Sequence, residues 1–457
     1  AQIIFQIDNI PLEGVFKILS DISQFLNFED PSISLSAYAA VCTACIENPD
    51  ICFEPTFFNS LLECIANTLQ TTQPSLIKRA LTSFVSLISP YSRNDLDSNL
   101  TPCFPNIVPL LMSLTERQDI SSDLNLQNQV YLVFFKYLSK LPQGFPIIEL
   151  QGFATQILSQ LQELTAQGAG LQTRAWYSNI VNGIAMRLQS EIEPLAYDFL
   201  TIFINTCEEI NRTKATIYSH EEVIGVISCL ISVTGQLCQP LIPNILEIAI
   251  NALSNTSLVS YASILIHTLF GNFGENLFDA IPDVMNALID CLLSQNVNEN
   301  SYPWILHAIT TLINVGKQPY YPLIANLEGS KSDQYDEMYG AIANILYPKR
   351  DELMSMVINF ISLLKDFEQN SRENAMNIFS ELLAFFASIM KVYEFEMQDD
   401  LNYPTKKMPP EFFIGYKDKF IEVIKIGYEL KLYSNSIALN FLEFIRMIMK
   451  TFTTYFQ

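Results

Sequence analysis

A repeat of 39 residues constrains the fold of this chain more than any other feature. Gly235 precedes Pro243 by eight residues, and Gly274 precedes Pro282 by eight. After each proline, apolar residues recur at i, i+3, i+4, i+7 and i+8, which is the spacing of one buried helix face. These positions are Ile245, Ile248, Ala249, Ala252 and Leu253 in the first copy and Val284, Ala287, Leu288, Cys291 and Leu292 in the second. Two helices in the same register predict stacked structural units.

Prolines extend this pattern along the chain. They are predicted to open apolar helical segments at Pro105, Pro146, Pro194, Pro243, Pro282 and Pro322, at spacings of 39 to 49 residues. Proline suits the first turn of a helix, where its missing N–H would have no partner. Each unit is predicted to hold a helix A, a short turn and a helix B. The predicted pairs are 11–27 with 31–47, 54–70 with 75–90, 192–209 with 219–236, 240–253 with 257–273, 279–295 with 301–315, 349–366 with 371–392, and 410–430 with 433–455. Irregular insertions are predicted at 329–333 and 394–411.

A period of ~40–47 residues with two helices per unit is typical of HEAT and armadillo repeats. One helical pair cannot bury its apolar face alone, so neighbouring pairs stack into a solenoid. We therefore predict an all-α HEAT-repeat solenoid that runs through residues 1–457 as one continuous body of about ten helix pairs. Because the sequence begins with Ala1, we expect it to be a fragment of a longer chain.

Composition narrows the possible partners. Apolar residues make up 49% of the chain, charged residues 16%, and the formal net charge is −22. Such a charge repels nucleic acid and attracts basic partners, although acidity also keeps an apolar chain in solution. The basic residues do not cluster, so we expect no nucleic-acid binding. We find no apolar run of the ~20 residues that cross a bilayer, so we expect neither membrane insertion nor a signal peptide.

Residues with catalytic or metal-binding potential are sparse. The three histidines, His220, His267 and His307, form no i, i+4 pair, and no motif supplies a nucleophile with its base. We expect no enzyme activity, no cofactor and no metal site. The loop from Gly271 to Gly274 could cradle phosphate at a helix start, but a helix C-cap is the alternative. Cys42 and Cys45 form the one CxxC pair, and the nine scattered cysteines indicate core positions in a reducing compartment.

Candidate functional residues therefore lie on surfaces. Acidic residues occur near predicted B-helix starts: Glu221, Glu222, Asp333, Asp336 and Glu337. If B helices line a concave face, these carboxylates form a groove for Lys/Arg-rich ligands. Compensation of the helix dipole is the alternative reading. Trp304 stands beside a predicted B-helix start, where it could stack on a cationic side chain or pack against the turn.

Several stretches resemble importin-β, a nuclear import receptor, in its C-terminal half. The similar stretches occur in the same order in both chains: "NSLLECIANTL" from Asn59, "HEEVIGVISCL" from His220, "FGN" from Phe270, "IPDVMNALIDCLL" from Ile281, "SYPWIL" from Ser301 and "EMYGAIANIL" from Glu337. The resemblance implies a right-handed HEAT superhelix. It implies that the inner face binds a basic segment, such as the importin-β-binding domain of importin-α or a cargo nuclear localisation signal. It also implies that slots between outer A helices bind phenylalanine-glycine (FG) nucleoporins, and that the protein occurs in the cytoplasm, the nucleus and the nuclear pore.

Two departures from the family concern the residues with which it binds importin-α. Thr82 stands where the family carries a tryptophan that stacks on the basic helix, and "LNFLEFI" from Leu439 replaces a second family stretch. The resemblance implies that the GTPase Ran binds mainly to an N-terminal half, which we expect to be absent from this sequence. The resemblance therefore favours a non-enzymatic transport-receptor fragment. The alternatives are a karyopherin that binds cargo directly, or a HEAT scaffold of another class, such as a phosphatase scaffold subunit or a coat adaptor.

Overall fold

The computed structural model describes residues 12–92, 98–168, 170–214, 216–294, 297–298 and 301–315, together with scattered positions between 341 and 446. The described residues form helices and turns, and none of them lies in a strand. The chain divides into two compact units, unit 1 from Ala1 to Cys238 and unit 2 from Gln239 to Gln457. A single continuous solenoid through both units stays a prediction.

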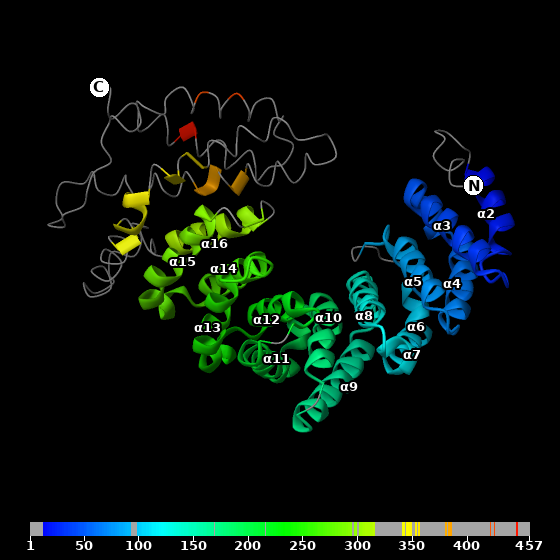
Figure 1. Ribbon diagram of the computed structural model, residues 1–457, viewed down its shortest axis with the longest axis horizontal. Coiled ribbons are helices and arrows are strands. Elements are labelled where there is room, and N and C mark those ends of the chain that lie inside the picture. Colours follow the sequence, from blue (N-terminus) through cyan, green and yellow to red (C-terminus); the bar gives the residue numbers. More distant parts are fainter. Residues whose placement is uncertain are drawn as a thin grey trace. The chain divides into compact units, whose positions relative to one another are not determined.

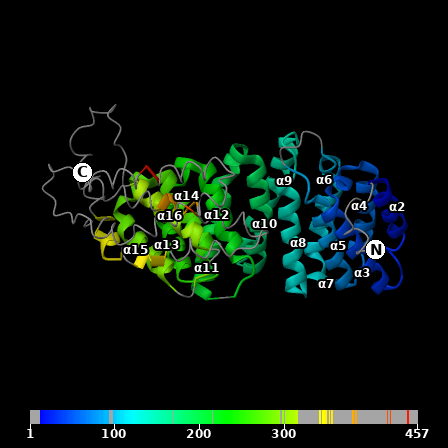
Figure 2. The same ribbon diagram turned by 90° about the horizontal axis from the view of Figure 1, so that it is seen from above.

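Unit 1 is built from paired helices (Figures 1 and 2). Their bounds are α2 Leu12–Ser23, α3 Pro31–Glu47, α4 Pro55–Leu69, α5 Pro74–Ile88, α6 Leu100–Glu116, α7 Gln118–Ser121, α8 Leu124–Ser139, α9 Ile147–Ala166, α10 Leu171–Leu188, α11 Glu193–Thr213 and α12 His220–Thr234, with 3₁₀ turns at Pro49–Phe53 and Gln189–Ile192. The predicted pairs 11–27/31–47, 54–70/75–90 and 192–209/219–236 are confirmed.

The helices of unit 1 form two layers. We call α2, α4, α6, α9 and α11 the A layer, and α3, α5, α8, α10 and α12 the B layer. Successive B helices pack directly on one another: α3 on α5, α5 on α8, α8 on α10 and α10 on α12. Helix α10 shows the result, because twelve of its eighteen residues are buried, including Trp176. A helix covered by two neighbours and by its own A partner is buried on most sides.

In unit 2 the same arrangement is present in α13 Ile242–Leu253, α14 Val259–Phe273, α15 Ile281–Leu293 and α16 Tyr302–Val315. A 3₁₀ turn, Gly274–Ala280, joins the two pairs, and a further 3₁₀ turn spans Tyr347–Lys349. B helix α14 packs on α16, and A helix α13 packs on α15. The predicted pairs 240–253/257–273 and 279–295/301–315 are confirmed. The remaining predicted pairs fall mostly, and the insertions at 329–333 and 394–411 entirely, outside the described residues.

Proline marks helix starts in most of the predicted places. Pro194, Pro243 and Pro282 occupy the first turns of α11, α13 and α15, and Pro146 is the N-cap of α9. Pro105 does not open its helix, because α6 begins five residues earlier at Leu100. The prediction failed there because apolar residues precede as well as follow the proline. Pro322 lies outside the described residues.

The two glycines of the 39-residue repeat serve different purposes. Gly235 follows the last turn of α12 with a φ of 54° and a ψ of −134°, a conformation that glycine adopts far more readily than other residues. Gly274 also follows a helix, α14, but its φ is −48°. A Cβ at Gly274 would overlap the methyl groups of Val315 on α16. Gly274 is therefore required by close packing between repeats and not by its own backbone.

Basic side chains join neighbouring repeats in unit 1. The Lys140 ammonium, at the end of α8, donates to the carbonyls of Ser89 (2.8 Å) and Tyr91 (2.6 Å) beyond the end of α5. The Arg187 guanidinium, near the end of α10, donates to the carbonyls of Pro142 (2.8 Å) and Gln143 (2.5 Å) beyond α8. Carbonyls beyond helix ends lack helical partners, so a cation there is stabilising. Each B-helix end in this part of unit 1 is thus capped from the next repeat.

One helical run contradicts the expectation that no apolar stretch is long enough for a membrane span. His220–Leu253 has a mean hydropathy of 1.5 and passes the test of length and composition. In the fold this run is divided by Gly235–Leu241 into α12 and α13. Half of its most apolar window is buried. The run is apolar because both helices contribute residues to the protein core. Core helices can be as long and as apolar as a membrane-spanning helix.

Candidate functional site

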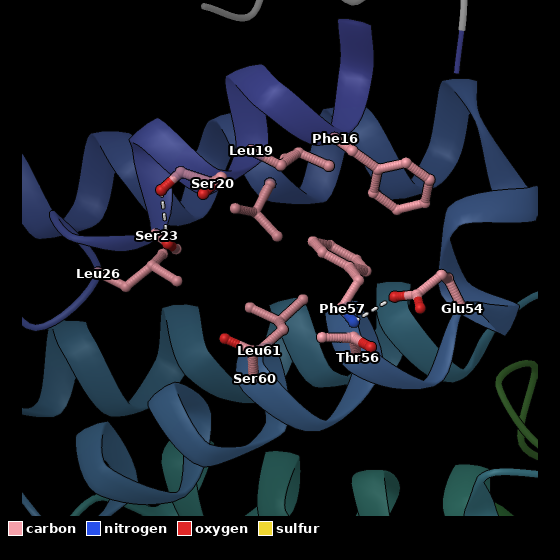
Figure 3. Close-up of a pocket in the computed structure, with 11 residues that line it drawn as sticks. Phe16, Leu19, Ser20, Ser23, Leu26, Glu54, Thr56, Phe57, Ser60 and Leu61 are labelled. Atoms are coloured by element: carbon pink, nitrogen blue, oxygen red, sulfur yellow. Dashed lines mark hydrogen bonds between the residues drawn. The ribbon is translucent and has the colours of Figure 1, made fainter. Parts of the chain in front are cut away.

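An apolar pocket lies between the first two A helices, α2 and α4 (Figure 3). Its cavity volume is about 200 Å³. Leu19, Leu26, Val41 and Leu61 line it and are buried. The other lining residues are Phe16, Ser20, Ser23, Glu54, Thr56, Phe57 and Ser60, of which Ser20, Thr56 and Ser60 are exposed. An apolar floor with a polar rim is the usual form of a site for an apolar side chain.

Phe16 of α2 and Phe57 of α4 form one wall of the pocket. Their ring centroids lie 6.2 Å apart with an interplanar angle of 64°, an edge-to-face arrangement. Both rings are half-buried. The close-up shows Leu19 above and Leu61 below, pointing toward the space between the helices. The two helices therefore leave an opening because their facing side chains do not interdigitate fully.

The start of α4 fixes the position of Phe57. Glu54 is the N-cap, and its carboxylate accepts from the backbone N–H of Phe57 at 2.5 Å. Pro55 follows in the first turn. Phe58, next along the helix, is fully buried and anchors α4 in the core. With the neighbouring residue held in the core, Phe57 projects from α4 toward α2.

Glu221 and Glu222 occupy the first turn of α12, as predicted for a B-helix start. Both side chains are half-buried. Oε2 of Glu222 has no exposed surface and no hydrogen-bond partner. Burial, and then the charge of Glu221, raise the pKa of Glu222 to about 7. Glu222 is thus an acid that lacks the partner a buried carboxylate requires.

A buried polar cluster holds the start of α12 against α8 and α10. The hydroxyl of Ser219 donates to Oδ1 of Asn128 at 2.8 Å, and the indole N–H of Trp176 donates to the same oxygen at 3.1 Å. The Asn179 amide donates to the Ser219 hydroxyl at 3.2 Å. Ser219 has a φ of 64°, an unusual conformation for serine. This cluster fixes the direction in which Glu221 and Glu222 leave the helix.

Trp304 lies in the first turn of α16, and 45% of its surface is exposed. Its ring is therefore accessible from solvent, and its predicted contact with a partner stays a prediction. Thr82, at the position of the family tryptophan, lies on α5, where its hydroxyl donates to the Lys78 carbonyl at 2.9 Å and accepts from the Gln129 amide at 3.2 Å. Asp333, Asp336 and Glu337 lie outside the described residues, so their predicted role is untested.

Two histidines meet in a way that sequence reasoning missed. The ring centroids of His267 on α14 and His307 on α16 lie 4.1 Å apart. Nδ1 of His307 is also 3.0 Å from Oε2 of Glu381. The two histidines are 40 residues apart, one repeat, so the same register in successive B helices could have identified the pair. The third histidine, His220, has a pKa lowered by burial, with Glu221 acting in the opposite direction.

Cysteines and acidic residues form no metal-binding group within the described part of the chain. All nine cysteines are free thiols. Cys42 and Cys45 of the CxxC pair are buried in α3, and Cys42 is hydrogen-bonded to the Ser83 hydroxyl at 3.0 Å. Gly271 and Gly274 lie at the end of α14 and in the following 3₁₀ turn. The phosphate interpretation loses its main support there, because Gly274 serves packing.

Comparison with known proteins identifies the repeats. Residues 60–327 match the model of the family described as "Importin subunit beta-1-like, TPR repeats". Comparison with curated protein sequences finds no match. Solved structures of importin-β match over 96% of this chain and 55% of theirs, with a TM-score of 0.60 and 14% identity. Yeast importin-β (Kap95p) matches over 97% of this chain and 53% of that chain, with a TM-score of 0.58 and 14% identity. A Kap95:Nup1 complex matches over 96% and 53%, with a TM-score of 0.57 and 14% identity.

These structures support the fold, and the sequence match supports the family. The chain spans about half the length of the solved relatives. The matched region begins within α4 and extends beyond the end of α16, so it includes both layers of helices. Since the family model covers more than half of the 457 residues, this chain belongs to the importin subunit beta-1-like family, with an all-α HEAT-repeat fold.

Proposed function

We propose that the chain is the adaptor- and cargo-binding part of a nuclear transport receptor. In this proposal the A layer binds FG nucleoporins, and the B-layer surface binds a basic segment of importin-α or of a cargo. The pocket between α2 and α4 is the observation that carries the proposal. The receptor would work in the cytoplasm, the nucleus and the nuclear pore, without catalysis or a cofactor. Ran would bind to a part of the receptor that lies N-terminal to this chain.

The size of the pocket suits an inserted side chain. About 200 Å³ is below the roughly 300–1,000 Å³ of sites for drug-sized ligands. Its opening is framed by two half-buried phenylalanines, Phe16 and Phe57, which offer ring edges and faces to a further aromatic ring. A phenylalanine on a flexible, glycine-containing segment fits such a pocket without requiring a large interface. One relative of the same fold is in complex with Nup1, which supports a nucleoporin as the occupant.

The acidic start of α12 supports the second half of the proposal. Glu222 has a buried oxygen without a partner, and Glu221 stands next to it. An incoming lysine or arginine would supply the missing donor and would favour the charged form of Glu222. Trp304 offers a separate exposed ring on which a cation can stack. Asp333, Asp336 and Glu337 are proposed to extend the acidic surface.

Binding to immobilised FG repeats tests the pocket. Ser60 is exposed on the pocket rim, so Ser60→Trp fills the opening without removing a core residue. We expect this variant to lose at least about tenfold in affinity for FG repeats, because the pocket is no longer open. The matched control is Asn59→Trp, an exposed neighbour that does not line the pocket. Equal binding by the two variants would contradict the proposed site.

The same pair of variants separates the two halves of the proposal. A fluorescent importin-β-binding peptide and a cargo nuclear-localisation peptide should bind both variants as they bind the parent chain. Both peptides should be tested because Thr82 replaces the family tryptophan that stacks on the basic helix of importin-α. A karyopherin that binds cargo directly would bind only the nuclear-localisation peptide. Failure of both peptides to bind at low salt would reject the basic-segment half and leave the FG half standing.

A further inference from the structure

Each histidine of the pair in unit 2 has a hydrogen-bond partner at Nδ1. Nδ1 of His267 is 2.7 Å from the hydroxyl oxygen of Thr311, and Nδ1 of His307 is 3.0 Å from Oε2 of Glu381. The Thr311 hydroxyl itself donates to the His307 carbonyl at 3.0 Å. That hydroxyl must therefore accept from His267, which places the proton of neutral His267 on Nδ1. A second proton on His267 would have to enter on Nε2.

Few other charges act on this pair. Helices α14 and α16 contain no aspartate, glutamate, lysine or arginine, so the two histidines are their titratable side chains apart from tyrosine. Glu381 is the acidic group that faces them from the third segment packed there, among the residues that the structure describes. The His307 side chain is 39% exposed and that of Glu381 27%. The three groups thus form a small cluster that is open to solvent protons.

The geometry allows one positive charge, and so one proton beyond the neutral forms, on the two rings. Two imidazolium cations with centroids 4.1 Å apart would repel each other. The hydrogen bond to Glu381 raises the pKa of His307 above its ordinary value. Burial, and then the positive charge of His307, lower the pKa of His267 to about 4. The added proton therefore belongs on His307, which lies between His267 and the carboxyl group of Glu381.

We propose that His267, His307 and Glu381 form a one-proton latch that holds the helical segment around Glu381 against α14 and α16. Leu383 and Phe385 of that segment are fully buried, so its attachment affects core packing in unit 2. Two changes of protonation weaken the latch. Loss of the proton removes the His307–Glu381 ion pair, and gain of a second proton sets the two rings against each other.

The pH window follows from the directions of the two pKa changes. The raised pKa of His307 gives a stabilisation that is complete below the ordinary value of 6.5 and is lost as pH rises through the folded value. The lowered pKa of His267 gives the opposite dependence, and stability is lost as pH falls from 6.5 through about 4. The latch is therefore tightest near the ordinary histidine pKa and weakens on both sides.

Histidine-selective isotope labelling of the whole chain tests the latch, because the chain has only three histidines. The imidazole resonances, assigned with His→Gln variants, report each midpoint directly. We expect His307 to titrate above its ordinary value and His267 to remain neutral until far lower pH. Glu381→Gln should lower the midpoint of His307 and leave that of His220 unchanged. His307→Gln should raise the midpoint of His267, because its charged neighbour is gone.

Amide hydrogen exchange at Leu383 and Phe385, corrected for the intrinsic effect of pH, gives the second readout. We expect protection to be greatest near neutral pH in the parent chain and to lose its alkaline dependence in His307→Gln. Equal midpoints for His267 and His307 would overturn the proposal. So would a His307 midpoint that Glu381→Gln does not move, since a purely structural contact would leave the titration unchanged.

Discussion

Glu193 and Glu222 are the same residue type in the first turns of successive helices, α11 and α12, but their surroundings differ. Glu193 is exposed, and there a carboxylate interacts favourably with the helix dipole. Glu222 is half-buried with one oxygen sealed from water. From their positions in the sequence alone, both residues would be interpreted as carboxylates that compensate the helix dipole. Burial makes Glu222 an unfavourable charge in the free protein and a candidate contact for a cation.

Replacing Glu222 should therefore stabilise the free chain in a pH-dependent way. Folding raises the pKa of Glu222 from 4.5 to about 7, so the folded state binds more protons between these values. Stability then falls as pH rises through this window. We expect Glu222→Gln to gain about 1–3 kcal/mol in the free energy of unfolding above pH 7 and to gain nothing near pH 4.5.

Urea unfolding at several pH values, followed by circular dichroism, measures this difference. The matched control is Glu193→Gln, which should show no gain at any pH because its carboxylate is exposed. The same Glu222→Gln variant should bind the basic peptide more weakly. A variant that is neither more stable at high pH nor weaker in binding would remove Glu222 from the proposed surface.

Between elements, a close approach links the end of α14 to α16. Gly274 leaves no room for a Cβ beside Val315, whereas a Cβ at Gly271, on the last turns of the same helix, would meet nothing within 4 Å. We expect Gly274→Ala to cost about 1–3 kcal/mol through overpacking. Gly271→Ala should instead stabilise α14 by up to ~1 kcal/mol, because alanine favours helix.

Amide hydrogen exchange in α14 and α16 distinguishes these two substitutions within one unit. Gly274→Ala should lower protection in both helices, and adding Val315→Ala should restore part of it. If Gly274→Ala were as harmless as Gly271→Ala, the close approach would not be a constraint on the repeat.

The elements also show what sequence patterns can predict. Periodicity and proline placement predicted the bounds of α13 to α16 within a few residues, because turn and core signals repeat there with the same spacing. They did not pair α6 with α8 or α9 with α10, since Pro105 and Pro109 lie inside α6 and no glycine marks its end. The burial of Glu222 and the meeting of His307 with Glu381 could not be predicted, because both depend on distant segments. The 40-residue spacing of His267 and His307 was a usable signal.

For the whole molecule, a net charge of −22 predicts different salt responses for the two proposed surfaces. The Debye length falls from ~10 Å at 0.1 M salt to ~3 Å at 1 M, so contacts between charged groups weaken. Burial of apolar side chains is not weakened by salt in this way. Affinity for the basic peptide should fall by about tenfold or more across this range, whereas affinity for FG repeats should hold or rise.

Fluorescence anisotropy with the two ligands on the same preparation measures both responses. Poly-glutamate of similar length serves as a control that should not bind at any salt concentration. Parallel loss of both affinities would place the two ligands on one charged surface. A salt-independent affinity for the basic peptide would reject the role assigned to the acidic residues.

The basic side chains that cap neighbouring repeats also bear on how such a chain can change by duplication. Lys140 reaches the carbonyls beyond α5, and Arg187 reaches those beyond α8, but the last turn of α12 contains no basic residue. Copying one helix pair would place a basic side chain beside a turn whose carbonyls it is not positioned to reach. Deleting one pair would leave the carbonyls of a turn without their cation. The helix pairs therefore share a backbone arrangement, but one pair cannot simply replace another. Substitution within existing repeats is a more accessible route to new variants than a change in their number.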